Sequence, residues 1–175
     1  ELRYSLRCSY RVSEVRDAAE APYAFEVQTP AAISVGGAGT VSLRIQRRAK
    51  TRSVEGQLML LLALPAGMEL ADLSEAAKTT GARRIERKGS QWAFYFEKAP
   101  AEASWTWRLD VKGVAQGHFK AGTSTIYPYY EPERIAFARA RDLRVVGVGE
   151  PLPTGNGIAG QATQAGQATQ AGQGR

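Results

Sequence analysis

The sequence has 175 residues, of which 43% are hydrophobic and 23% are charged, and its formal net charge is +6 at pH 7. This apolar content is near the average of globular domains, so the composition excludes a chain that is disordered throughout. No apolar run reaches the roughly 18 residues that a membrane-spanning helix needs. At about 100–200 residues per domain, the length predicts one domain with some additional chain.

Alternation of apolar and polar side chains is the main structural signal. It extends over residues 2–10, 23–27, 41–45, 92–96 and 105–111. A period of two is typical of strands that bury one face. The last two segments carry three tryptophans and two phenylalanines, and we expect them to form a hairpin-like pair around the loop that contains Pro100.

The middle of the chain combines a buried strand with one helix. The run Leu58 to Leu64 is almost entirely apolar, which predicts a central strand covered on both faces. Residues 71–79 have apolar positions at helical spacing, with Asp72 near the start, where the helix dipole favours an acid. Gly81 is expected to end this helix. Residues 83–87 read as the next strand.

The glycine-rich segment 35–39 lacks the lysine of a phosphate-binding loop, and a strand rather than a helix follows it. We therefore predict a hairpin turn there. Further strand-like segments follow at 119–130 and 135–148. Short strands separated by turns, with a single helix, predict an all-β fold: an antiparallel β-sandwich, Ig-like in architecture, with one short inserted α-helix.

The end of the chain has a different composition. Residues 149–175 are rich in glycine, glutamine, alanine and threonine, and the hexad Gln-Ala-Thr-Gln-Ala-Gly occurs at 161–166 and again at 167–172. Such a segment has little apolar surface to bury, so we predict a disordered tail.

The inventory of reactive side chains is small. There is one cysteine, Cys8, and one histidine, His118, which excludes an internal disulfide and a Cys/His metal site. We expect Cys8 to be a small buried side chain, with an intermolecular bridge or a reactive thiol as alternatives. No nucleophile motif accompanies His118, so a solvated or capping histidine is favoured. The sequence predicts no catalytic residue, no metal site and no cofactor.

Basic residues are denser in two places. One run extends from Arg44 to Arg52; the other comprises Arg83, Arg84, Arg87 and Lys88. A well-solvated surface is the favoured interpretation, because acids are interspersed and no nucleic-acid motif is present. Binding to an acidic polymer is the alternative.

One segment combines three tyrosines with two prolines: Tyr127-Pro128-Tyr129-Tyr130-Glu131-Pro132. Packing of the rings and a partner-binding patch are both compatible with this composition. With Ile126 in front, the segment resembles the Val-Tyr-Asp-Tyr-Tyr-Glu motif of the alpha-2-macroglobulin family, near the end of its receptor-binding, macroglobulin-like domain. The order of the strands and the helix between residues 58 and 111 is similar as well.

This resemblance implies a domain organisation. Residues 1–20 would be a strand and linker from a preceding domain, residues 21–148 a receptor-binding-like β-sandwich, and residues 149–175 the tail. The chain would be part of a longer polypeptide. Neither a bait region nor a Cys-Gly-Glu-Gln thioester occurs in these residues, and the positions of the family's two receptor-contacting helix lysines hold Leu70 and Ser74, which leaves Lys78 as the one lysine of the helix.

The resemblance implies a non-catalytic C-terminal interaction domain of a secreted protease inhibitor or complement-like protein. Such a domain would contact sister domains of its parent chain, a cell-surface receptor or a protease complex, outside the cell or in a bacterial periplasm. The candidate partner-binding residues are Lys78, Arg83, Arg84, Tyr127, Tyr129, Tyr130 and Glu131. The alternative is a freestanding secreted β-sandwich for adhesion or polyanion binding, which the net charge and the run from Arg44 to Arg52 favour.

Overall fold

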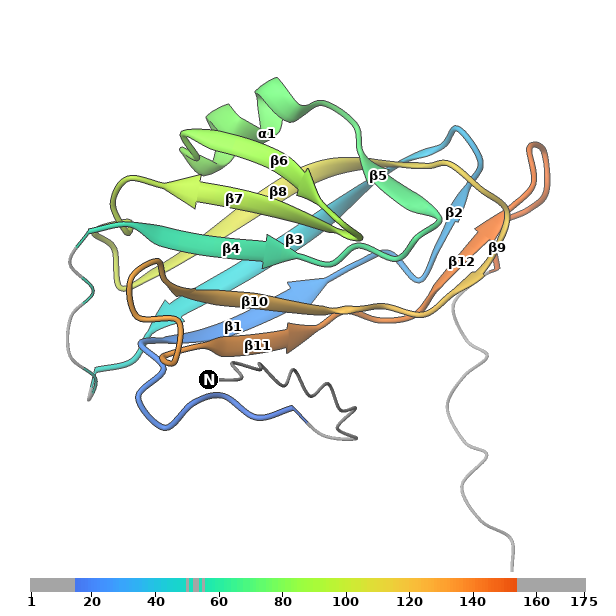
Figure 1. The fold of residues 1–175 in the computed structure, drawn as a ribbon. Helices are drawn as coiled ribbons and strands as arrows, with labels where there is room; N and C mark the ends of the chain where they lie inside the picture. Colours follow the sequence, from blue (N-terminus) through green and yellow to red (C-terminus); the bar gives the residue numbers. More distant parts are fainter. Residues whose placement is uncertain (1–14, 50, 52–53, 55, 154–175) are drawn as a thin grey trace, which may run out of the picture.

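The computed structural model describes residues 15–49, 51, 54 and 56–153, and these form twelve strands and one helix (Figure 1). The predicted strand at 2–10, with Cys8, lies outside the described residues, as does most of the predicted tail. The domain boundaries proposed from the sequence therefore stay predictions.

Two antiparallel sheets lie face to face (Figure 1). The four-stranded sheet has the order β1-β3-β8-β5, with the bounds β1 Tyr23–Gln28, β3 Ala38–Arg47, β8 Ser104–Gly113 and β5 Met68–Leu70. The five-stranded sheet has the order β11-β10-β4-β7-β6, with the bounds β11 Ala136–Arg139, β10 Thr123–Pro128, β4 Leu58–Leu62, β7 Gln91–Phe96 and β6 Arg84–Lys88. The predicted β-sandwich is confirmed.

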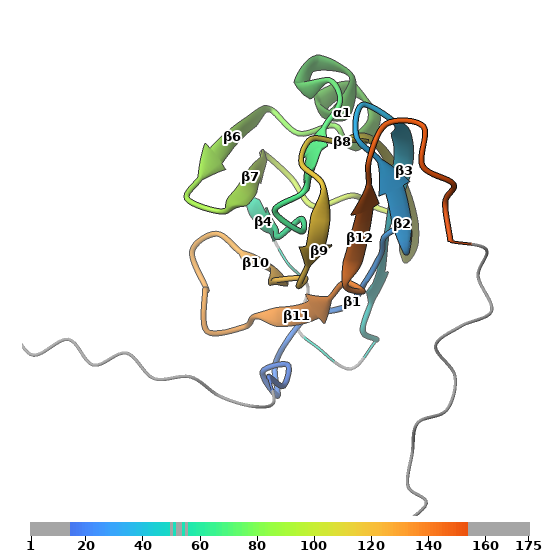
Figure 2. The ribbon, with the colours of Figure 1, turned by 90° about the vertical axis from the view of Figure 1, so that its right-hand side faces the viewer.

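A smaller sheet closes one end of the sandwich, in the order β2-β12-β9 (Figure 2). Its strands are β2 Ala32–Ser34, β12 Leu143–Val146 and β9 Gly117–Phe119. The pairing of β2 with β12 is parallel, and that of β12 with β9 is antiparallel. The continuous strand predicted at 119–130 is divided between β9 and β10, so the chain passes there from one sheet to another.

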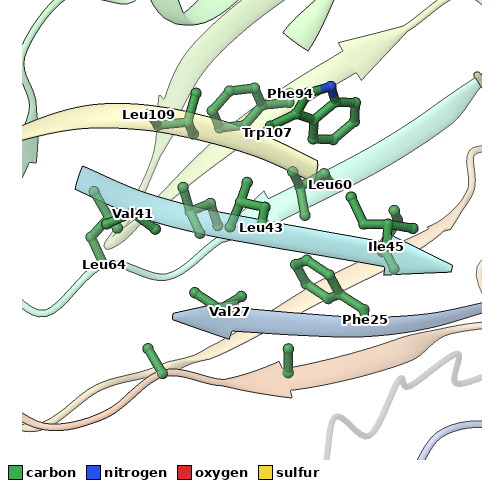
Figure 3. Packing of buried hydrophobic residues seen from close by; sticks show 14 of the residues in the cluster. Phe25, Val27, Val41, Leu43, Ile45, Leu60, Leu64, Phe94, Trp107 and Leu109 are labelled. Atoms are coloured by element: carbon green, nitrogen blue, oxygen red, sulfur yellow. The ribbon is translucent and has the colours of Figure 1, made fainter. Parts of the chain in front are cut away.

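The core fills the space between the two larger sheets. Figure 3 shows Val41, Leu43 and Ile45 of β3 pointing into the same layer as Leu60 and Phe94 of the facing sheet. Phe96 stacks on Trp107 with 5.0 Å between the ring centroids and an angle of 7° between the planes. Such aromatic pairs add about 0.5–1.5 kcal/mol to the stabilisation from burial alone.

This stacking corrects one prediction. The alternating segments at 92–96 and 105–111 are β7 and β8, and they do not pair as a hairpin: β7 pairs with β4 and β6, whereas β8 pairs with β3 and β5. Their aromatic side chains meet because the two strands face each other across the core. Local alternation identifies the buried face of a strand but carries no information about its neighbour in the sheet.

The predicted helix is present as α1, Leu73–Thr80, and it lies along the edge of the sandwich between β5 and β6 (Figure 1). Asp72 caps it: the carboxylate accepts hydrogen bonds from the backbone N–H groups of Ser74 and Glu75, at 2.7 and 3.1 Å. These bonds, led by that from Glu75, lower the pKa of Asp72. Gly81 ends the helix in the left-handed conformation, with φ of 72°.

The central position predicted for the run at Leu58 is confirmed, since β4 is the middle strand of the five-stranded sheet. Its inward side chains, Leu58, Leu60 and Leu62, are almost completely buried. On the outward face Met59 is buried and Leu61 is half-buried, so the predicted cover on that face is present in part. At the edge of this sheet, residues 17 and 18 cover part of β11: the N–H of Phe137 donates to the Asp17 carboxylate at 2.7 Å.

The glycine-rich segment at 35–39 also differs from its prediction. The N–H of Gly37 donates to the carbonyl of Ser34, so a tight turn is present, but the strands on either side, β2 and β3, belong to different sheets. Gly113, at the end of β8, exchanges backbone hydrogen bonds with Gly36 and Gly37 at 2.9 and 3.0 Å. This segment is a junction between sheets rather than a hairpin.

The junction leaves no space for a side chain at position 113. A Cβ atom there would overlap the backbone carbonyl of Ser34 and crowd Ile33. We predict that Gly113→Ala lowers the free energy of unfolding by about 1–3 kcal/mol, because the backbone must shift to admit the methyl group. Urea unfolding followed by tryptophan fluorescence measures this change. The neighbouring exposed substitution Lys112→Ala is expected to stay within about 0.5 kcal/mol of the parent chain, and equal effects would contradict the prediction.

Candidate interaction groove

A row of four side chains crosses the outward face of the five-stranded sheet. The strand register places Arg84 of β6 beside Tyr95 of β7, Tyr95 beside Met59 of β4, and Met59 beside Tyr127 of β10. All four point outward because their neighbours along each strand, such as Phe94 and Leu60, point into the core. The outer face of the sheet therefore holds a basic, an aromatic and an apolar group side by side, although Met59 itself is only 4% exposed.

A groove of about 260 Å³ lies along one side of this row. Its wall is completed by Tyr129, which follows β10 and whose N–H donates to the carbonyl of Gln57 at 2.9 Å. This backbone bond continues the pairing of β10 with β4 by one residue and so fixes the position of the ring. The groove is lined by Gln57, Leu58, Arg83, Arg84, Tyr95, Phe96, Glu97 and Tyr129. We call this set, with the adjoining Tyr130, the tyrosine–arginine groove.

Aromatic and cationic groups contact one another along the groove. The Arg84 guanidinium lies 5.9 Å from the centre of the Tyr95 ring, a cation–π distance. The Tyr95 and Tyr129 rings are 6.4 Å apart, and Tyr130 meets Tyr129 edge to face at 5.1 Å. Tyr129 is 42% exposed and Tyr130 is 75% exposed. Tyrosine and arginine at such positions are the residue types that dominate protein–protein binding energies.

Both arginines of the groove form ion pairs with glutamates. Arg83 forms an ion pair with Glu97, and Arg84 forms one with Glu86. The hydroxyl of Tyr95 donates to Glu86 as well, at 2.6 Å. This hydrogen bond to Glu86 is the main cause that raises the pKa of Tyr95 above its ordinary value of 10.0. The groove is thus polar at its rim and charge-balanced.

A buried arginine fixes the turn that carries the tyrosines. Arg134 is only 4% exposed, and its guanidinium donates to the Glu131 carboxylate at 2.8 Å and to the backbone carbonyl of Glu20 at 3.2 Å. The N–H of Glu131 donates to the carbonyl of Pro128 at 3.0 Å. Glu131, a candidate partner-binding residue, is thereby engaged inside the fold.

The remaining candidates lie outside the groove lining. Tyr127 stands in the row beside Met59, donates its hydroxyl to the Met59 sulfur at 3.1 Å, and has a pKa raised chiefly by burial. Lys78 is on α1, exposed, and pairs with Glu75 at 3.5 Å. Of the two positions compared with the family's helix lysines, Ser74 is on α1, whereas Leu70 is buried in β5 rather than on the helix.

The structure thus brings together Arg83, Arg84, Tyr129 and Tyr130 from the sequence candidates, and it adds Tyr95, which sequence reasoning missed. A signal for Tyr95 was present: it is an aromatic residue at an outward position of an alternating strand, between the inward Phe94 and Phe96. A tyrosine at such a position is exposed on the sheet unless something covers it.

Most arginines of the two basic runs in the described part of the chain are engaged by other groups. In the first, Arg47 donates to the carbonyl of Pro100 at 2.7 Å and Arg48 pairs with Asp17. In the second, Arg87 pairs with Glu69 at 3.0 Å, in addition to the pairs of Arg83 and Arg84. Asp17, Glu69 and Glu97 come from distant parts of the sequence, whereas Glu86 lies two residues from Arg84 on the same strand.

Among the residues that the structure describes, no three His, Cys, Asp or Glu side chains are arranged to hold a metal ion. The helix that the described segments form is too short and too polar to cross a membrane.

Comparison of sequences finds no match to a family model and none to a curated protein. Comparison of structures does find matches. Native alpha-2-macroglobulin from Escherichia coli, solved from domain MG7 to the C-terminus, superposes with a TM-score of 0.58 and 17% identity over 77% of this chain and 25% of that one. The fold is that of a domain of alpha-2-macroglobulin.

Two further structures support this likeness. Salmonella alpha-2-macroglobulin reacted with methylamine gives a TM-score of 0.54 at 17% identity, over 77% of this chain and 10% of that one. The native E. coli protein seen by cryo-electron microscopy gives 0.55 at 16% identity, over 76% and 10%. The chain therefore spans a quarter or less of these structures, and the family resemblance is confirmed at the level of the fold.

The Tyr95–Glu86 contact predicts a pH effect. The Glu86 carboxylate stabilises the protonated phenol of Tyr95. The contact therefore stabilises the folded state fully at a pH below the ordinary tyrosine pKa. This stabilisation is lost as the pH rises through the raised pKa of Tyr95. We predict that Glu86→Gln lowers the pKa of Tyr95 toward its ordinary value. NMR titration of ring-labelled tyrosine between about pH 8 and 12 measures it, and Tyr95→Phe identifies the signal. An unchanged midpoint would show that Glu86 does not set this pKa.

Proposed function

We propose that this chain is a non-catalytic interaction domain of a larger protein of the alpha-2-macroglobulin type, placed at its C-terminal end. The likeness in fold to bacterial alpha-2-macroglobulins, and the share of their length that the chain spans, support this proposal. The parent protein would be secreted or periplasmic and would inhibit peptidases by trapping them. The proposal therefore includes secretion of the parent protein, trapping of peptidases and contact with a receptor, and it is based on the fold.

The observation that carries the proposal is the tyrosine–arginine groove. It combines two exposed tyrosines with two arginines that are already ion-paired, on a rigid sheet. Exposed aromatic rings beside charge-balanced arginines suit a protein surface, because the rings supply contact area and the paired charges need little rearrangement on binding. We propose that a sister domain of the parent chain occupies this groove in one state of the protein and that a receptor or protease complex contacts it in another.

We predict that peptides covering 83–97 and 127–131 exchange their amide hydrogens more slowly in the native-length protein than in the 175-residue chain. Contact with a sister domain would slow this exchange about tenfold, equivalent to about 1.4 kcal/mol of protection.

The mass of the native polypeptide is measured first, and we expect a chain several times longer than 175 residues. A native chain of only 175 residues would refute the multidomain proposal.

The matched variants are made in the native-length protein. Tyr129→Ser with Tyr130→Ser is expected to abolish the added protection at 83–97, since the rings supply the contact. Val148→Ser with Leu152→Ser removes two other exposed apolar side chains, from the segment that follows β12, and is expected to leave the protection intact. Protection that survives the loss of both tyrosines would show that the groove is not the contact surface.

A further inference from the structure

A second surface, at the end of the sandwich away from the tyrosine–arginine groove, carries a row of basic side chains. Segments 117–123 and 139–145 run antiparallel to each other: His118 lies beside Arg144 in the pairing of β9 with β12, and Thr123 lies beside Arg139 in the pairing of β10 with β11. Figure 2 shows β9 and β12 side by side. The two segments form one twisted ribbon that passes from the five-stranded sheet to the small sheet.

The outward positions of this ribbon hold four cations: Lys120, Arg139, Arg141 and Arg144. All four are exposed, and the alternate positions Ala140, Leu143 and Val145 are buried, so the charged side chains lie on the solvent side. At about 3.3 Å per residue, the row from position 118 to position 123 is roughly 17 Å long. We call these four residues the basic ribbon.

These charges differ from the ion-paired arginines of the two basic runs. Within the described segments none of the four forms an ion pair, whereas Arg48, Arg83, Arg84 and Arg87 each do. The one acid in the two segments is Asp142, and its carboxylate accepts the N–H of Ala121 at 3.1 Å. The outward face of the four-stranded sheet, in contrast, is mixed: the register places Arg44 beside Glu26 and Lys112 beside Glu69.

The surroundings of the basic ribbon restrict what it can bind. Segments 117–123 and 139–145 contain none of the large hydrophobic residues that are exposed in the described part of the chain, which are Val15, Leu73, Val114, Tyr129, Tyr130, Val148 and Leu152. Tight protein–protein contacts usually centre on well-packed anchors beside aromatic or apolar side chains, and single-stranded nucleic acid needs aromatic rings on which its bases stack. The ribbon offers neither, and so it favours a strongly hydrated anion.

The size of the patch distinguishes between two hydrated polyanions, duplex DNA and an acidic polysaccharide. Proteins that bind duplex DNA commonly contact about 6–10 phosphates over a broad surface. Four cations in one narrow row match a single flexible chain better. Arginine, which supplies three of the four, presents a planar fork that fits carboxylate and sulfate oxygens.

We propose that the basic ribbon binds an acidic polysaccharide, a single chain that carries carboxylate or sulfate groups. The surface is separate from the tyrosine–arginine groove, so this proposal holds whether or not the groove binds a sister domain. It also differs from the polyanion site suggested by the sequence, because Arg47 and Arg48 of that run are engaged within the fold.

The test measures binding of the 175-residue chain to a fluorescent heparin oligosaccharide, which carries sulfates and carboxylates, and to alginate, which carries carboxylates only. We expect binding at about 50 mM NaCl that weakens steeply with salt. The triple variant Arg139→Gln, Arg141→Gln, Arg144→Gln should weaken heparin binding by roughly ten- to a hundred-fold and reduce the salt dependence. Binding to heparin alone would assign the site to sulfate, and binding to both would show that carboxylate suffices.

A charge-matched control separates the site from the net charge. Arg44→Gln, Arg108→Gln and Lys112→Gln remove the same number of charges from the mixed face of the four-stranded sheet and should change binding by less than about threefold. Unchanged thermal unfolding would confirm that both variants fold. Equal losses in the two triple variants, absence of polysaccharide binding, or tighter binding to a duplex DNA of about 20 base pairs would each overturn the proposal.

Discussion

The packing of β3 against β4 is the constraint on which the other features depend. Both are interior strands of their sheets, and their inward leucines and isoleucine fill the layer between the sheets. Because side chains alternate along a strand, fixing the inward set also fixes the outward set. Leu58 and Leu60 must point inward, so Met59 points outward between Tyr95 and Tyr127. A register shift of one residue would expose the leucines and turn Met59 into the core, away from the row beside the groove.

The local parts of the fold were predictable from the sequence, and the long-range pairings were not. Alternation identified β1, β3, β7 and β8, and Asp72 and Gly81 marked the limits of α1 within one or two residues. These signals are short-range properties of strand and helix geometry. The partner of each strand depends on how the whole core closes, so β7 and β8 were paired with each other in the prediction although they belong to different sheets. The glycines at 36 and 37 were likewise read as a hairpin because a turn between sheets uses the same backbone conformations.

The candidate site was predictable in pieces. Tyr129 and Tyr130 drew attention by composition, and Arg83 and Arg84 by charge, but their meeting depends on the order β6-β7-β4-β10 across the sheet. The ion pair of Arg83 also depends on tertiary structure, since Glu97 is 14 residues away in the sequence. The basic ribbon was not predicted from the sequence. Its charges are sparse along each segment, and they form a row only when residues 118–123 lie beside residues 139–144.

The edge strand β6 has a consequence for how the groove can be used. An edge strand with free backbone N–H and C=O groups can recruit a strand from another molecule and start aggregation. The opposite edge of this sheet is partly covered, since Asp17 accepts the N–H of Phe137 on β11. At β6 the protection is chemical: Arg84, Arg87 and Lys88 are exposed along five residues, and a bulky charged edge disfavours the flat approach of a second strand. A partner at this end of the sheet would therefore be recognised through side chains, and pairing of two copies of the domain through β6 is disfavoured.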